Sequence, residues 1–351
     1  MTLRSKVSRF GSRLDREVGN ANRRWSNREG LIFVAEMRTK SRGTEIVHRG
    51  FGEASPLPGY SPDTIEECEA CLNDIELFDA SKLTLTTIEA LVLSMPAVPA
   101  ARFAVETALC DLLAQRLQQS VGGLFGQYAT SARRCALLDP ERPMRSAEAI
   151  LARGITCAKL KVGTHWTEEL VAIKRLRAEF PELGLRIDAN ASWTLPAAKK
   201  RLALLEGLGL EFVEQPVAPG VMYSLIESPV PIAADESLHS AAGREALEPL
   251  MREGGLHAIV LKPTVLGGFA ACLKLQQWAR MHKTVAIASH CYEGPVGTAA
   301  VAELALAMDS TMASGVDEHE VLASVSNVAV PQLAGRFIQL HHGGLGVVVE
   351  V

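Results

Sequence analysis

The feature that most constrains the fold is a regular alternation of short apolar runs with helix-length stretches between residues 131 and 320. The intervening stretches are amphipathic, as TEELVAIKRLRAEF and GFAACLKLQQWARMH illustrate. The strand candidates are RCALL, CAKLKV, LGLRID, LEFVE, PIAAD, AIVLK, VAIAS and a weaker run near TMASGV. Because strand–helix units of this kind pack as parallel strands covered by helices, the pattern predicts an α/β barrel of about eight strands.

The first 125 residues do not follow this pattern and are predicted to form a separate α+β module. GLIFVAEMRT and HRGFGEAS are typical of an antiparallel pair, and helices are expected in TIEECEACLNDIELF and ARFAVETALCDLLAQRL. We therefore expect a capping module over residues 1–125, the barrel over 131–320, and a tail over 321–351 that packs back on the first module. The first 30 residues are rich in arginine but contain no apolar segment, so they do not resemble a secretory signal. They predict either a basic solvated arm or an arginine-bearing loop at a site for an anionic substrate.

The composition limits the possible partners. A hydrophobic fraction of 48% and a formal net charge of −4 favour neither nucleic acid nor a membrane. Seven cysteines in mostly apolar surroundings indicate buried thiols in a reducing cytoplasm. Cys68 and Cys71 form a CxxC in a predicted helix, and His341 and His342 lack partners at ligand spacing, so neither pair predicts a metal site. We expect the two histidines at the surface or capping a helix, and the sequence leaves the oligomeric state open.

Three acidic residues, Asp188, Glu214 and Asp235, end successive strand candidates. A parallel barrel brings such strand ends together at one face. Carboxylates that converge there repel one another and lose hydration unless a cation offsets their charge. An all-oxygen set of ligands favours a hard divalent ion such as Mg²⁺. The sequence therefore predicts a metal site at the mouth of the barrel.

Lysines flank this set of acids at other strand ends. Lys159 and Lys161 are two residues apart, so on one strand both side chains point to the same face, while Lys262 ends a later strand. A buried ammonium is costly without a partner, which leaves either a structural salt-bridge layer or a catalytic role. Proximity of cations and partial desolvation would lower the pKa of a lysine enough for it to take a proton. The set predicts metal-assisted removal of a proton next to a carboxylate.

These residues, in this order, resemble the enolase superfamily. The resemblance implies a modified (β/α)₇β TIM-type barrel with an α+β N-terminal capping domain. The lysine positions are similar to those of the branch that contains muconate-lactonising enzymes, dipeptide epimerases, N-succinylamino acid racemases and o-succinylbenzoate synthases. The resemblance implies Mg²⁺, which Mn²⁺ could replace, as the cofactor. It assigns Asp188, Glu214 and Asp235 as ligands, Lys161 as the base, Lys262 as the opposite lysine, and Lys159 and Asn190 as supporting residues.

Within this branch the segments GEASPLPGYS, IAADESL and VLKPTVLGG resemble the o-succinylbenzoate synthase family. That resemblance implies a cytoplasmic lyase of menaquinone biosynthesis, which removes water from 2-succinyl-6-hydroxy-2,4-cyclohexadiene-1-carboxylate through a metal-stabilised enediolate. The run SHCYEGPVG departs from the serine-rich sequence expected after the seventh strand, leaving Ser289 to bind a carboxylate and the role of His290 open. Further substrate contacts are expected from the capping loops at Arg23, Arg24, Pro58 and Gly59, although a solvated loop would also explain the two arginines.

Two other functions stay open at this stage. A racemase of N-succinylamino acids or an epimerase of dipeptides would use Lys161 and Lys262 alternately on opposite faces of its substrate. Near the eighth strand the sequence has Asp317, Glu318 and His319 in place of the Asp-x-Asp that holds a dipeptide ammonium in the epimerases, which disfavours a dipeptide substrate. A non-catalytic metal-binding protein would explain the carboxylates but not the costly buried lysines.

Overall fold

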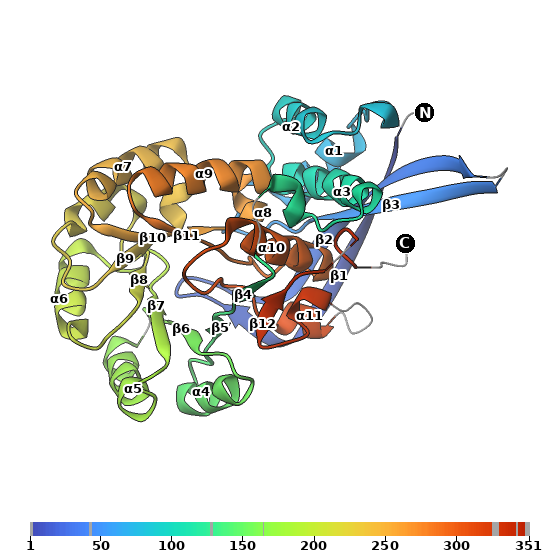
Figure 1. Cartoon of the computed structure of the whole chain (residues 1–351). Helices are drawn as coiled ribbons and strands as arrows, with labels where there is room; N and C mark the ends of the chain where they lie inside the picture. Colours follow the sequence, from blue (N-terminus) through green and yellow to red (C-terminus); the bar gives the residue numbers. More distant parts are fainter. Residues whose placement is uncertain are drawn as a thin grey trace.

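The computed structural model describes residues 3–41, 44–126, 129–163, 165–324, 330–341 and 343–347. Two bodies of secondary structure are visible in Figure 1, a curled parallel sheet with helices around it and an antiparallel sheet beside it. This arrangement confirms the predicted barrel and its α+β partner. Among the described residues, no helix combines the length and hydropathy needed to cross a membrane.

Seven parallel strands form the barrel sheet in the order β11-β10-β9-β8-β7-β6-β5. All seven lie within the runs predicted from the sequence or extend them by one or two residues. Their bounds are β5 Ala136–Leu137, β6 Cys157–Lys161, β7 Gly184–Asp188, β8 Phe212–Glu214, β9 Ile232–Ala234, β10 Leu256–Leu261 and β11 Val285–Ala288.

The weak eighth run completes the ring without forming a full strand. Ser314 bridges to Arg134 beside β5, and Gly315 bridges to Ser289 beside β11, both in the parallel sense. The Gly315 amide donates to the Ala288 carbonyl at 2.8 Å, and the Cys135 amide donates to the Ser314 carbonyl at 2.8 Å. The segment near TMASGV therefore joins the two edges of the sheet, as predicted.

Helices follow the strands and cover the outside of the barrel (Figure 1). Pro143, Pro263 and Pro295 each stand at the start of a helix, where the missing amide proton costs no hydrogen bond. The barrel helices are α4 Pro143–Ala152, α5 Trp166–Glu179, α6 Leu195–Leu205, α7 Ala241–Arg252, α8 Pro263–Leu266, α9 Phe269–Met281 and α10 Pro295–Met308, with 3₁₀ turns η3 Pro219–Leu225 and η4 Glu236–Leu238.

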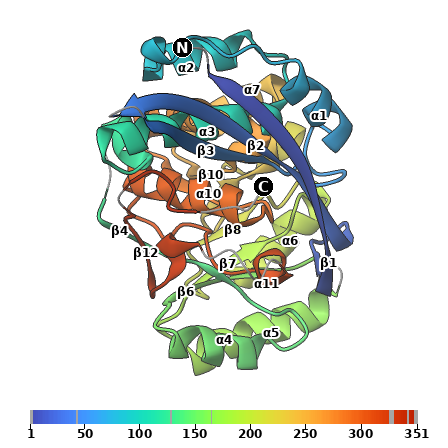
Figure 2. The same cartoon turned by 90° about the vertical axis from the view of Figure 1, so that its right-hand side faces the viewer.

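The N-terminal sheet has three long antiparallel strands, β1 Arg4–Gly19, β2 Arg24–Ser41 and β3 Thr44–Ala54, in the order β1-β2-β3. The predicted pair corresponds to β2 and β3. The interpretation of the first residues as an arm or loop is wrong for residues 4–19, which form a strand that pairs with β2 at residues 4–13, 18 and 19. Figure 2 shows β1 crossing from the side of α2 toward that of α5.

One irregularity interrupts the pairing of β1 with β2. Arg13 pairs with Asn27 and Val18 pairs with Trp25, so residues 14–17 of β1 stand opposite the single residue Ser26. Leu14 and Val18 are the buried side chains of this part of the strand. The bulge bends β1 and carries its end, Gly19, toward the mouth of the barrel.

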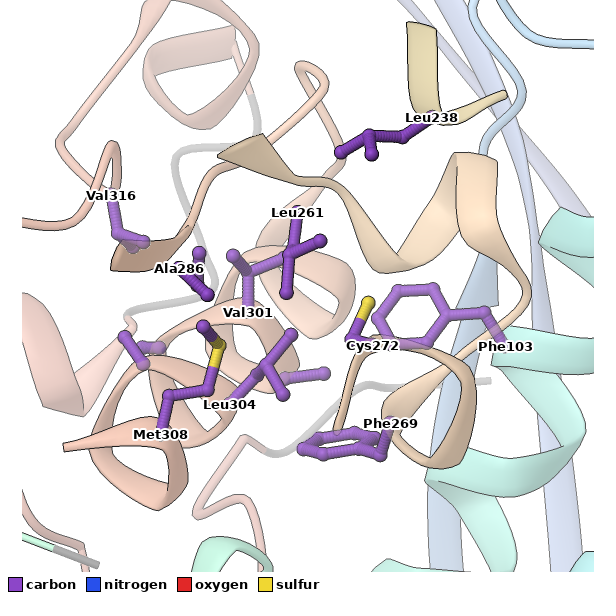
Figure 3. Packing of buried hydrophobic residues seen from close by; sticks show 14 of the residues in the cluster. Phe103, Leu238, Leu261, Phe269, Cys272, Ala286, Val301, Leu304, Met308 and Val316 are labelled. Atoms are coloured by element: carbon purple, nitrogen blue, oxygen red, sulfur yellow. The ribbon is translucent and has the colours of Figure 1, made fainter. Parts of the chain in front are cut away.

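Three helices accompany the sheet: α1 Ile65–Asn73, α2 Leu85–Ser94 and α3 Pro99–Leu117, with 3₁₀ turns η1 Ala80–Lys82 and η2 Gly122–Phe125. The structure adds α2 to the two predicted helices. In α1, Cys68 is buried beside Asp63, with its thiol 3.6 Å from the carboxylate. Phe103 of α3 lies 6.2 Å from Phe269 of α9, measured between ring centroids, and Figure 3 shows this contact continuing into the barrel core. The two modules therefore share one hydrophobic core.

Buried carboxylates also join the modules. Glu106 of α3 accepts hydrogen bonds from the amides of Phe269 and Ala270 at the start of α9. Glu53 of β3 accepts from the amides of Gly294 and Gly297 at the start of α10. In each case a carboxylate from the N-terminal module caps the amino end of a barrel helix, where unpaired amides and the helix dipole stabilise negative charge.

The tail contacts both modules. The short strand β12 Phe337–Gln339 pairs with β4 Ser131–Arg133, ahead of the barrel. The Leu345 amide donates to Asp111 of α3 at 2.9 Å, and the helix α11 Glu320–Ser324 packs on β1. His341 is half-buried, whereas His342 and residues 348–351 lie outside the described residues. The exact domain boundaries stay a prediction.

Candidate active site

Three buried acids stand at the ends of adjacent strands, as the sequence predicts. Asp188 ends β7 and pairs in register with Glu214 at the end of β8, and Asp235 directly follows β9. Each is about 1% exposed. Gln215 connects the second and third positions, because it directly follows β8 and its side-chain oxygen accepts a hydrogen bond from the amide of Asp235 at 3.0 Å.

Lys159 lies between two of these acids. Its ammonium is 3.1 Å from Asp188 Oδ2 and 2.9 Å from Glu214 Oε2. Burial, reinforced by the neighbouring Asp188 carboxylate, raises the pKa of Glu214 to about 7. Burial alone would raise the pKa of Asp235 as well, but the Lys262 ammonium holds it well below its usual range. The charge of each acid at this face therefore depends on its charged neighbours.

The donor set fits a hard divalent cation by its chemistry. In the part of the chain that the structure describes, no three His, Cys, Asp or Glu side chains are arranged around a common point as metal ligands. However, Asp235 Oδ1, Asn190 Oδ1 and Glu236 Oε2 are buried oxygens without a hydrogen-bond partner. Buried acceptors are normally satisfied, so these atoms indicate that the face can accept a further cationic or donor group.

Lys161, the predicted base, ends β6 and has a different environment from Lys159. Its Nζ donates to the Gly19 carbonyl at 2.7 Å and to the Tyr292 hydroxyl at 3.1 Å. It also lies 5.1 Å from the centroid of the Tyr292 ring. The partners thus come from the end of β1 and from the loop after β11, and both are uncharged.

Lys262 directly follows β10, on the far side of the ring from β6 in the strand order. Its Nζ donates to Asp235 Oδ2 and, at 2.7 Å, to the Tyr60 hydroxyl. The Tyr60 hydroxyl in turn donates to Asp235 Oδ2 at 2.8 Å. Lys262 is 7% exposed, and it is therefore held in a buried ion pair that a tyrosine from the N-terminal module covers.

One pocket brings these groups together. Its lining includes the predicted residues Lys159, Lys161, Asp188, Asn190, Glu214, Lys262 and Ser289. Asp235 contacts the lining lysine Lys262, and His290 also faces the pocket. The structure thus gathers the predicted lysines, acids and Ser289 at one end of the barrel, while their roles stay predictions.

The predicted capping-loop contacts lie elsewhere. Arg23 and Arg24 are exposed, and the Arg23 guanidinium packs against Gly59. Pro58 uses its carbonyl to accept the Trp25 indole N–H at 3.1 Å. None of these four predicted residues is in the pocket lining.

Instead, the N-terminal module reaches the pocket through residues beside the predicted ones: Asn20, Trp25, Leu57 and Tyr60. From the barrel, Tyr292 also lines it and was not singled out by sequence reasoning. Tyr60 belongs to the GEASPLPGYS segment and Tyr292 to the SHCYEGPVG run, so both segments were flagged although the residues were not.

Asp317, in the segment where a dipeptide-binding acid would be expected, is already paired. Its carboxylate accepts hydrogen bonds from Arg134 and, at 2.7 Å and 3.1 Å, from Arg153. It is 4% exposed. Two residues later, the ring centroid of His319 lies 4.4 Å from that of His290, with the two rings tilted by 32°, and burial lowers the pKa of His319 to about 3. Both arginines therefore commit the Asp317 carboxylate to a structural ion pair.

Two proteins are similar in sequence to most of this chain. An L-Ala-D/L-Glu epimerase from Escherichia coli is 30% identical over 265 residues, covering 73% of this chain and 76% of that protein. An o-succinylbenzoate synthase from Pectobacterium atrosepticum is 28% identical over 354 residues, covering 93% and 95% of the two chains.

Solved structures support the same fold. A muconate lactonizing enzyme from Pseudomonas fluorescens gives a TM-score of 0.83 at 21% identity, covering 99% of this chain and 96% of that one. A dipeptide epimerase from Enterococcus faecalis, complexed with Mg and the dipeptide L-Leu-L-Tyr, gives 0.82 at 23% identity, covering 99% and 100%.

A family model described as Enolase C-terminal domain-like matches residues 143–350, which is more than half of the chain. This segment contains every barrel strand from β6 to β11, and thus all the predicted lysines and acids of the pocket. The chain therefore belongs to the enolase superfamily, in its muconate-lactonising-like branch.

Proposed function

We propose that the protein is an o-succinylbenzoate synthase, a lyase that removes water from 2-succinyl-6-hydroxy-2,4-cyclohexadiene-1-carboxylate. The observation that carries the proposal is one pocket lined by Lys161 and Lys262 from strands on opposite sides of the barrel, beside three buried carboxylates. Lysines and carboxylates arranged in this way can remove a proton next to a carboxylate. The proposed substrate would place the enzyme in menaquinone biosynthesis, in the cytoplasm.

Asp188, Glu214 and Asp235 would hold the divalent ion, and Asn190 and Glu236 stand next to them with unpaired oxygens. We propose Mg²⁺, with Mn²⁺ as a substitute, because the donors are all oxygen. A relative of the same fold was crystallised with Mg, which supports this choice. When bound, the ion would offset the negative charge that develops on the substrate carboxylate.

The lysines would carry the proton. Lys161 takes the proton from the carbon next to the ring carboxylate. The electron pair of that C–H bond forms the new ring double bond to the adjacent carbon. The C–O bond on the adjacent carbon breaks, and Lys161 returns its proton to the departing hydroxyl, so that water leaves from the same face. Lys262 remains protonated on the opposite side and stabilises the developing negative charge.

A racemase or epimerase is the second candidate. It is favoured by the presence of two lysines on opposite sides of the pocket and by the identity to an epimerase of Escherichia coli. The ion pairs of Asp317 with Arg134 and Arg153 argue against a dipeptide, because that acid is not free to hold a substrate ammonium.

The deciding experiment follows aromatisation of the cyclohexadiene by ultraviolet absorbance, with and without Mg²⁺, in the wild type and in Lys161→Ala. Rapid turnover that needs the metal and is lost in the variant would support the synthase. If no turnover occurred while Mg²⁺ still bound, the proposal would fail. Exchange of the α-proton of N-succinylamino acids and dipeptides in D₂O would then test the racemase.

A further inference from the structure

The amino group of Lys161 has two uncharged acceptors that come from different parts of the fold. The Gly19 carbonyl lies 2.7 Å away at the end of β1, and the Tyr292 hydroxyl lies 3.1 Å away in the loop after β11. Neither residue was given a role by the proposed proton transfer. Both acceptors therefore act on the base and not on the substrate.

An amine nitrogen is tetrahedral, and one of its four directions is the bond to Cε. When two N–H bonds point to fixed acceptors, the fourth direction is also fixed. In neutral lysine this direction holds the lone pair that takes a proton, and in the ammonium it holds the third N–H bond that gives the proton back. Two acceptors therefore aim both steps along one line, which suits removal and return on one face of the substrate.

Tyr292 is itself held firmly. Its φ of 58° is in the left-handed region, which costs energy for a bulky residue and is maintained only by surrounding contacts. Its amide donates to His290 Nδ1 at 3.2 Å, and its ring meets those of His290 and His319 edge-on at 5.3 Å and 5.6 Å. The residue is 8% exposed, so its hydroxyl has little freedom to move.

Arg28 of β2 holds the loop that carries Tyr292 in place. It is 2% exposed, and its guanidinium donates to the carbonyls of Tyr292 at 3.0 Å, Pro56 at 2.9 Å and Ser55 at 2.7 Å. One side chain of β2 thus connects the loop that carries Tyr292 with the segment that leads to Tyr60. The position of the hydroxyl next to Lys161 is built into both modules.

We propose that Tyr292 is a positioning residue, whose hydroxyl acts together with the Gly19 carbonyl to aim the Lys161 amine at the substrate. The proposal rests on the proposed function only in requiring that Lys161 is the base. It assigns to Tyr292 no proton transfer and no contact that determines substrate affinity.

The test is Tyr292→Phe, which removes the hydroxyl and keeps the ring. We expect kcat for aromatisation to fall by about 10-fold to 100-fold, because a slightly misdirected base loses much of its rate. KM, and the affinity for the product o-succinylbenzoate measured by calorimetry, should stay within about twofold, since the hydroxyl serves the lysine. Tyr223→Phe is the matched control, because Tyr223 is half-exposed on η3, and it should behave as the wild type.

Tyr292→Leu is the second variant, and it should lose at least as much kcat as Tyr292→Phe. Wild-type kcat in a folded Tyr292→Phe would overturn the proposal, and so would an unchanged kcat with a raised KM and weaker product binding, because Tyr292 would then bind substrate. The variant Lys161→Ala distinguishes a failure of the positioning role from a failure of the proposed function. If Lys161→Ala kept its activity, the proposed function itself would fail; if only Tyr292→Phe did so, the positioning role alone would be wrong.

Discussion

The mouth of the barrel and the junction of the two modules both hold buried acids, and the partners of these acids differ. At the mouth of the barrel, Asp188 and Glu214 share the Lys159 ammonium, and Asp235 pairs with Lys262. At the junction of the modules, Glu53 and Glu106 accept hydrogen bonds from backbone amides at helix starts. The acids are equally buried in both regions, so burial does not distinguish them.

The two regions differ in whether nearby buried oxygens lack hydrogen-bond partners. A carboxylate capped by backbone amides has its partners fixed by the fold, so it stabilises one arrangement of helices. A carboxylate paired with a lysine beside oxygens that lack a hydrogen-bond donor, such as Asn190 Oδ1 and Glu236 Oε2, can exchange that partner for a ligand. Buried charge therefore indicates a functional site when its partners are side chains and its hydrogen bonds are incomplete.

The largest effect is expected when the lysines at the mouth are replaced by arginines, which keep the positive charge. Lys161→Arg should lower kcat by about 10²–10⁴-fold, because a guanidinium stays protonated and cannot act as a base. Lys262→Arg is the matched control and should lose less, since it keeps the positive charge on the opposite face. Steady-state rates of aromatisation measure both, and equal losses would contradict the separate roles.

At the junction, the expected effect is on stability and its pH dependence. Burial raises the pKa of Glu106 from 4.5 to about 7. Between these values the folded chain binds the proton more tightly than the unfolded chain, so the free energy of unfolding falls as the pH rises through this interval. Glu106→Gln removes the titrating group and should reduce that fall by roughly 3 kcal/mol.

Urea denaturation at pH 4.5, 6 and 8 would measure it, and Glu148→Gln, an exposed substitution on α4, should leave the pH dependence as in the wild type. An unchanged pH dependence in Glu106→Gln would show that this carboxyl does not carry the effect.

A smaller effect is expected on the affinity for the metal, which should depend on the acids of the mouth and not on those of the junction. Glu214→Gln should weaken Mg²⁺ binding by about tenfold or more, because ligand charge sets the affinity of oxygen sites. Glu106→Gln, from the other region, should leave the affinity unchanged. Isothermal titration calorimetry would measure the Mg²⁺ affinity of both variants. If both weakened binding equally, or neither did, Glu214 would not be a ligand.

The barrel could be predicted because its strands are apolar and end in charged residues at regular intervals. The same pattern located Asp188, Glu214 and Lys262, since a parallel sheet places its strand ends together. Strand β1 was missed because Leu14 and Val18 are the only two buried residues within Arg4–Gly19, so its sequence lacks an apolar alternation.

The tyrosines could not be predicted for another reason. Tyr60 meets Lys262 across 202 residues, and this contact depends on how the two modules dock. Tyr292 meets Lys161 across 131 residues within the barrel, so this contact depends on how the barrel closes. The capping segments were recognised, but sequence does not show which side of a loop faces inward. Trp25 and Tyr60 face the pocket, whereas their neighbours Arg24 and Gly59 do not line it.

The bulge in β1 has a consequence for how this site could change during evolution. Gly19 meets Lys161 through a backbone carbonyl, which no amino-acid replacement deletes. The reach of that carbonyl depends on the extra residues at 14–17, which lengthen β1 relative to its neighbour. Insertions and deletions within this stretch, rather than point mutations, are therefore the genetic events that would redirect the amine, and directed evolution of new reactions should sample its length.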